Sequence, residues 1–175
     1  MRGRVALYLS LVGQALAAPT NVRRQEESCT ELSTTTPNWK LSNAASSDWP
    51  GGQSGRVELF ARHVPTGTMA DCDVEYQLNA DGEIIDYDPT SSHECLNFGA
   101  SSLNTTVQLD MDTLTLSIQS TWTCEGDDKK YSATGSVALK RDTSPGACLV
   151  EPSQVGDSTT CPIADVEVEG KLADA

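Results

Sequence analysis

Six cysteines that follow an apolar leader constrain the fold of this chain more than any other feature. They stand at Cys29, Cys72, Cys95, Cys124, Cys148 and Cys161. An even number of cysteines in an exported chain predicts three disulfide bonds, and six thiols allow fifteen pairings that the sequence by itself does not rank. No pair has the Cys-x-x-Cys spacing of zinc sites and thioredoxin-like motifs. We therefore expect structural disulfides, with no metal and no cofactor.

The N-terminus has the three regions of a secretory signal peptide. Met1–Arg4 is basic, Val5–Val12 is mostly apolar, and Ala15-Leu16-Ala17 has the small-x-small pattern at which signal peptidase cuts. The leader is too short to span a bilayer, and no second apolar run of about twenty residues follows it. These features predict a signal peptide over residues 1–17 and a secreted, extracellular protein without a membrane anchor.

A second processing site follows the leader. Arg23 and Arg24 form a basic pair ahead of Gln25, which predicts a short propeptide over residues 18–24. The alternative is an ordinary charged pair in a tail. Cleavage after Arg24 leaves residues 25–175, a length of 151 residues that suffices for a single domain with a modest core.

The mature chain is strongly acidic. Removal of residues 1–24 takes away four basic residues and no acid, which leaves eight basic residues against 25 acidic ones and a net charge of −17. Such a charge repels nucleic acid and anionic membrane surfaces, so neither is an expected partner. A cationic partner suits it better. The alternative is that the charge only keeps the protein soluble.

Apolar and polar residues alternate along most of the mature chain, which is the pattern of β-strands. The runs are Val57–Ala61, Cys72–Leu78, Tyr131–Leu139, and the shorter Trp39–Leu41 and Val166–Val168. The phase changes between Met111 and Leu114, which predicts a hairpin with its turn over Asp110–Thr113. No segment has the pattern of an amphipathic helix. The spacing predicts one all-β domain, an antiparallel β-barrel or sandwich stapled by disulfides.

Two partial motifs suggest catalysis and both are incomplete. His93-Glu94 begins like the His-Glu-x-x-His helix of a zinc protease, but Asn97 stands where the second histidine belongs. Gly52–Gly55 resembles a nucleophile elbow, but its closing glycine comes one residue early. The other histidine, His63, stands in no catalytic signature. We therefore expect a protein without enzymatic activity.

Acidic residues gather at two predicted turns. They are Asp81, Glu83, Asp86 and Asp88 at the first, and Asp110 and Asp112 at the second. The first turn partly matches a calcium-binding loop, but Gln77 stands at the position that normally supplies the first carboxylate. A glycosidase pair is also disfavoured, because solvent at a turn keeps both acids ionised. We interpret the six acids as a contact surface for a basic partner, with solvated turns as the alternative.

The sequence also predicts one modification and a role for its tryptophans. Asn104-Thr105-Thr106 is the N-glycosylation sequon, and it stands just before a predicted strand. We expect Asn104 to carry a glycan. Trp39, Trp49 and Trp122 are too dispersed to form a binding stripe, so we expect each to serve in packing.

Short segments spread over the mature chain share a pattern with a known family. They are the basic pair before Gln25, an early cysteine followed by Trp39–Ser42, Cys72 and Cys95 around an acidic turn, Thr121–Cys124, Ala133–Val137, and a closing cysteine pair. In these segments the chain resembles the small secreted fungal proteins related to the major allergen of Alternaria. The resemblance implies a β-barrel or sandwich with an allergen, spore- or wall-protein or elicitor role. No catalytic motif of that family carries over.

The resemblance also implies a disulfide pairing. The two disulfides of that allergen correspond to Cys72–Cys95 and Cys148–Cys161 in this chain. In that allergen an early cysteine joins two subunits. This chain has Cys124 as a sixth cysteine, so Cys29 can pair within the chain and the protein is expected to be a monomer or a weak homodimer.

Together these features predict an effector- or allergen-like protein that interacts with a basic host protein or with cell-wall components. The alternative is a carrier of a small aromatic, flavonoid- or lipid-like ligand. Such a carrier would use the barrel interior or a dimer groove.

Overall fold

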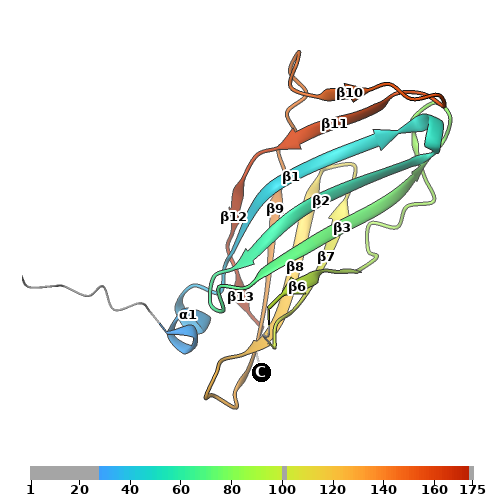
Figure 1. The fold of residues 1–175 in the computed structure, drawn as a ribbon. Coiled ribbons are helices and arrows are strands. Elements are labelled where there is room, and N and C mark those ends of the chain that lie inside the picture. The colour runs from blue at the N-terminus through green and yellow to red at the C-terminus, as the bar shows by residue number, and fades with distance from the viewer. Residues whose placement is uncertain (1–27, 100–101, 174–175) are drawn as a thin grey trace, which may run out of the picture.

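Antiparallel strands make up most of the chain, as the alternating pattern predicts. The structure is a computed structural model that describes residues 28–99 and 102–173 (Figure 1). Two curled antiparallel sheets form a half-barrel, so the predicted all-β fold is confirmed. The predicted signal peptide, the propeptide and Gln25 lie outside the described residues.

Sheet A contains the longest strands and most of the predicted runs. Among the described residues it has eight strands: β1 Trp39–Trp49, β2 Ser54–His63, β3 Met69–Leu78, β4 Ile84–Ile85, β6 Leu96–Phe98, β10 Leu149–Glu151, β11 Ser158–Ile163 and β12 Val166–Val168. Their order is β10-β11-β1-β2-β3-β4, with β12 also paired to β1 and β6 to β3. Strand β1 is longer than the predicted Trp39–Leu41, and its register shifts between Ser42 and Ala45.

Sheet B contains the predicted hairpin. In the described part of the chain its strands are β5 His93–Glu94, β7 Asn104–Asp110, β8 Thr115–Thr123, β9 Lys130–Ala138 and β13 Lys171–Leu172, in the order β13-β9-β8-β7-β5. Strands β7 and β8 pair with Leu109 opposite Leu116 and Asp110 opposite Thr115. Both leucines are buried, so the change of phase at the turn is what keeps an apolar inner face on each strand.

A short helix is present where we expected none. Helix α1 spans Cys29–Thr35, and a 3-10 turn, η1, spans Pro50–Gly52. The Ser28 side chain accepts a hydrogen bond from the Glu31 backbone N–H at 3.3 Å, which caps the N-terminus of α1. Helix α1 lies at the opposite end of sheet A from η1 (Figure 1). No helix in the described ranges is long and apolar enough to cross a membrane.

The core lies between the two sheets and is built around aromatic rings. Trp39 of β1 and Trp122 of β8 are both fully buried. The ring of buried His63 stands between them, with its centroid 5.9 Å from that of Trp39 and 4.4 Å from that of Trp122. The Trp39 indole N–H donates to the Ser120 hydroxyl at 3.0 Å and so joins sheet A to sheet B. The expected packing role holds for these two tryptophans.

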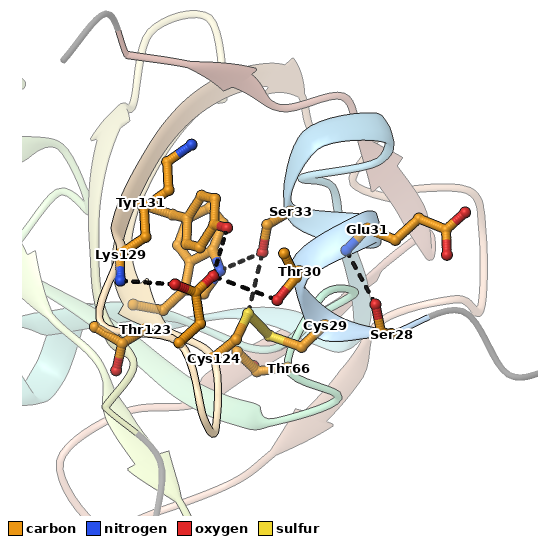
Figure 2. The surroundings of a disulfide bond; sticks show 12 residues. Ser28, Cys29, Thr30, Glu31, Ser33, Thr66, Thr123, Cys124, Lys129 and Tyr131 are labelled. Carbon is orange, nitrogen blue, oxygen red and sulfur yellow. Dashed lines mark hydrogen bonds between the residues drawn. A yellow bond between two sulfur atoms is a disulfide. The ribbon is translucent and has the colours of Figure 1, made fainter.

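Three disulfides join elements that are distant in sequence. They are Cys29–Cys124, Cys72–Cys95 and Cys148–Cys161, which leaves no free cysteine. The first ties α1 to the end of β8, and the Ser33 hydroxyl lies 3.5 Å from the Cys124 sulfur (Figure 2). Because Cys29 is bonded within the chain, it is not available to join two subunits.

Candidate functional site

Asp86 of the first predicted acidic turn and both acids of the second, Asp110 and Asp112, line one pocket. The segment after β4 and the β7–β8 turn line a pocket of about 230 Å³. Its lining residues are Ile84, Asp86, Tyr87, Pro89, Asp110, Met111 and Asp112, and we call it the acidic pocket. The fold therefore brings together carboxylates that stand 24 and 26 positions apart in sequence.

A partly buried hydrogen bond holds the two segments together. The Tyr87 hydroxyl donates to the Leu109 carbonyl oxygen at 2.7 Å, which fixes the segment after β4 against β7. Desolvation raises the pKa of Tyr87, and the charges of Asp110 and Asp88 raise it further. The phenol therefore stays protonated and keeps its donor role throughout the physiological pH range.

Two carboxylates of these turns are stabilised in their ionised form. Asp88 accepts hydrogen bonds from the Thr90 backbone N–H at 2.8 Å and from the Thr90 hydroxyl at 2.7 Å. Asp110 accepts from the backbone N–H groups of Asp112 at 2.9 Å and of Thr113 at 3.1 Å. These bonds lower the pKa of both carboxyls, chiefly through Thr90 for Asp88 and Thr113 for Asp110. Both side chains therefore keep their charge in mildly acidic surroundings.

The remaining predicted acids lie in a neighbouring turn and do not line the pocket. Asp81 and Glu83 belong to the β3–β4 turn, which the Asn79 side chain organises. Asn79 Oδ1 accepts from the backbone N–H groups of Asp81 at 3.0 Å and Glu83 at 2.8 Å. These contacts fit the solvated-turn alternative for this pair. Within the described residues no group of three or more potential ligands could hold a metal ion.

Strand β4 exposes two apolar side chains that the sequence analysis missed, of which Ile84 lines the acidic pocket and Ile85 does not. Ile84 is 40 % exposed and Ile85 38 % exposed, although both are large apolar residues. They form β4, at the end of the strand order of sheet A, so one side of this strand offers backbone groups for pairing. The signal was present in the sequence as two β-branched residues between acidic ones. An apolar centre with a polar rim is the general anatomy of a protein interface.

The other candidate residues lie elsewhere. His93 in β5 and Asn97 in β6 belong to different sheets, so the segment that starts like a zinc-protease motif is not a helix. Asn104 is exposed at the start of β7, where its side-chain N–H donates to a Glu94 carboxylate oxygen at 2.9 Å. His63 is fully buried, and burial lowers its pKa to about 4.

No protein-family model, curated protein or solved structure matches the chain.

Proposed function

We propose that this is a non-enzymatic, secreted interaction protein that binds a basic partner protein at the acidic pocket. The observation that carries this proposal is the meeting of Asp86, Asp110 and Asp112 around exposed Ile84 and partly buried Met111. Protein interfaces combine a small apolar centre with a polar rim. Here the rim is negative, so the complementary surface is positive.

The charge of the whole chain supports a basic partner. The formal net charge is −13, which creates a negative field around the molecule. Such a field attracts a basic protein from a distance and accelerates its association. Asp88 and Asp110 add to this field even in a mildly acidic medium, because their pKa values are lowered.

The three disulfides support an extracellular setting, because disulfides persist in oxidising compartments. The resemblance to the fungal allergen family supports an effector-like or allergen-like role, with a basic host protein or a cell-wall component as partner. The family assignment itself stays a prediction.

The carrier alternative has less support in the form that uses the barrel interior. Trp39, Trp122 and His63 fill the space between the sheets in the described part of the chain. A small aromatic or lipid-like ligand in the interior would have to displace these rings. We therefore place the interaction at the surface.

Two variants with equal changes of net charge test the proposal. The pocket variant combines Asp86→Asn with Asp112→Lys. Asparagine is chosen at position 86 because φ there is 52°, which asparagine tolerates better than lysine. The turn variant combines Asp128→Asn with Glu125→Lys in the exposed β8–β9 turn. Any difference between the two variants then reports the position of the charge, since the total charge is the same.

Immobilised mature protein is used to capture secreted proteins from a host tissue, and the captured proteins are identified by mass spectrometry. We expect wild type and the turn variant to retain the same basic protein and the pocket variant to lose it. Equal capture by all three proteins, or capture of acidic proteins alone, would contradict the proposal.

A further inference from the structure

A larger groove lies on the outer face of sheet A, beside η1. It has a volume of about 670 Å³, within the usual range of roughly 300–1,000 Å³ for small-ligand sites. Six of its lining side chains come from the three central strands: Ser47, Trp49, Ser54, Arg56, Glu75 and Gln77. We call it the Trp49 groove. It takes no part in the function proposed above.

Strand register arranges these side chains in two rows. Ser47, Arg56 and Glu75 stand opposite one another in the first row, and Trp49, Ser54 and Gln77 stand opposite one another in the second. Neighbouring strands are about 4.8 Å apart, and residues two positions apart on a strand are separated by about 6.7 Å. The rows therefore cover an area of about 10 Å by 7 Å on a rigid sheet.

Trp49 is held in place although it is exposed. Its exposed fraction is 36 %, whereas Trp39 and Trp122 are fully buried. The Trp49 indole N–H donates to the Gly156 carbonyl oxygen at 3.2 Å. A Cβ atom at Gly52 would lie 2.0 Å from Trp49 Cε3, so the glycine backbone packs directly against the ring. An aromatic ring fixed in this way loses little conformational entropy when a ligand stacks on it.

The polar groups of the groove include both donors and acceptors. Arg56 donates hydrogen bonds, Glu75 accepts them, and the Gln77 amide does both, as do the serine hydroxyls. A ligand rich in hydroxyl groups matches this mixture, because each hydroxyl also donates and accepts. The C–H groups on one face of a sugar ring form an apolar surface that packs on an aromatic ring. From this combination we propose that the Trp49 groove binds a neutral oligosaccharide.

Charge favours a neutral ligand over an ionic one. Arg56 is paired with Glu58 at 2.9 Å, so its charge is already balanced. Glu75 and the net charge of −13 repel an anionic ligand. The guanidinium of Arg56 and the carboxylate of Glu75 stand side by side in the first row, so the groove offers neither a cation nor an anion a surface of a single opposite sign.

The Trp49 groove and the acidic pocket are separate surfaces. Ile85 stands opposite Gln77 and extends the second row on the outer face, whereas Ile84 stands opposite buried Leu78 and lines the acidic pocket. Neighbouring residues of a strand point to opposite faces of the sheet. Variants of one site can therefore be tested without altering the other.

Titration of the mature protein with maltohexaose, cellohexaose and chitohexaose tests the inference. We expect saturable binding of at least one of them, seen by calorimetry and by a change in tryptophan fluorescence. Trp49→Ala and Glu75→Ala should each weaken that binding about tenfold or more, as for the central residues of other binding sites. Leu172→Ala, an exposed apolar residue on sheet B, is the matched control and should bind like wild type. Circular dichroism checks that every variant is folded.

Three results would overturn the inference. They are no binding of any of the three hexaoses, binding that Trp49→Ala leaves unchanged, and binding of only the charged probes hexalysine or hexagalacturonate. The pocket variant serves as a further control and should retain sugar binding. Partner capture by the pocket variant tests the acidic pocket, and sugar binding by the same variant tests the Trp49 groove. The two proposals can therefore fail independently.

Discussion

The indole N–H of Trp122 donates to the Ser33 hydroxyl at 2.7 Å, and both residues are fully buried. This bond joins α1 to the core of sheet B. Replacement Ser33→Ala leaves the indole N–H without its acceptor in a buried place, which costs about 1–3 kcal/mol. We therefore expect the free energy of unfolding to fall by about that amount, as measured by urea denaturation at pH 7.

Thr34→Ala is the matched control for this change. Thr34 lies next to Ser33 on the same helix but is exposed. Its hydroxyl donates to the Glu31 carbonyl oxygen at 2.9 Å, a contact within the helix. We expect its effect to stay within about 0.5 kcal/mol. If Ser33→Ala were as stable as Thr34→Ala, the bond from Trp122 would not support the fold.

The strands could be predicted from sequence because their signal is local, whereas α1 could not. Alternation in Val57–Ala61 and the phase change before Leu114 are visible in short windows. Helix α1 has only seven residues and no amphipathic pattern. It depends on distant contacts, the Cys29–Cys124 bond and the Trp122–Ser33 hydrogen bond. The spacing of Ser28 and Glu31, which is that of the Ser-x-x-Glu capping pattern, was the one local signal for it.

The sites depend on register and on distant pairing, which sequence does not reveal. Trp39 and Trp49 are ten positions apart, so strict alternation would put both on the same face. The register shift between Ser42 and Ala45 reverses the faces, so Trp39 is buried and Trp49 is exposed. We expected packing for Trp49 and missed the groove. In the same way, both acidic turns were predicted, but their meeting depends on the bond from Tyr87 to β7.

The Cys29–Cys124 disulfide should be the most stabilising of the three. It closes a sequence separation of 95 residues, against 23 for Cys72–Cys95 and 13 for Cys148–Cys161. A disulfide that closes a longer loop restricts the unfolded chain more. By this effect Cys29–Cys124 should stabilise the fold by about 1–2 kcal/mol more than Cys148–Cys161. We expect replacement of Cys29 and Cys124 by alanine to lower the free energy of unfolding more than replacement of Cys148 and Cys161.

Non-reducing peptide mapping and gel electrophoresis check the pairing. We expect the three disulfide-linked peptide pairs and no dimer that reduction dissociates. A free thiol at Cys29 together with a reducible dimer would mean that this cysteine joins two subunits.

Stability should fall with acidification because of His63. Burial lowers its pKa from 6.5 to about 4. Between these pH values the unfolded chain binds the proton more readily, so the free energy of unfolding falls as the pH falls from 6.5 to 4, by about 3 kcal/mol in all. Above pH 6.5 the contribution of neutral His63 is fully present. Urea denaturation of wild type at pH 7 and pH 4.5 measures this loss.

His63→Gln should remove most of this acid-dependent loss, because glutamine does not titrate. Protonation of Asp88 and Asp110 does not cause this loss. Because their pKa values are lowered, these carboxyls reduce the free energy of unfolding only below about pH 4. An equal loss of stability in wild type and His63→Gln between pH 7 and pH 4.5 would show that His63 is not the responsible group.

Asn104 should carry an N-linked glycan when the protein is expressed in a eukaryotic host. The residue is exposed at the start of β7, in a sequon. Mass spectrometry should find glycan mass on the peptide that contains Asn104, and Asn104→Gln should lack it. An unmodified peptide from wild type would refute this prediction.

The most direct test of the acidic pocket is the salt dependence of association with the purified basic partner. Raising the ionic strength from about 0.01 M to 0.15 M shortens the Debye length from about 30 Å to about 8 Å. We expect the association rate constant of wild type to fall markedly over this range and that of the turn variant to follow it. The pocket variant should associate more slowly at low salt and depend less on salt. Identical rates and salt dependence for wild type and the pocket variant would contradict the proposed function.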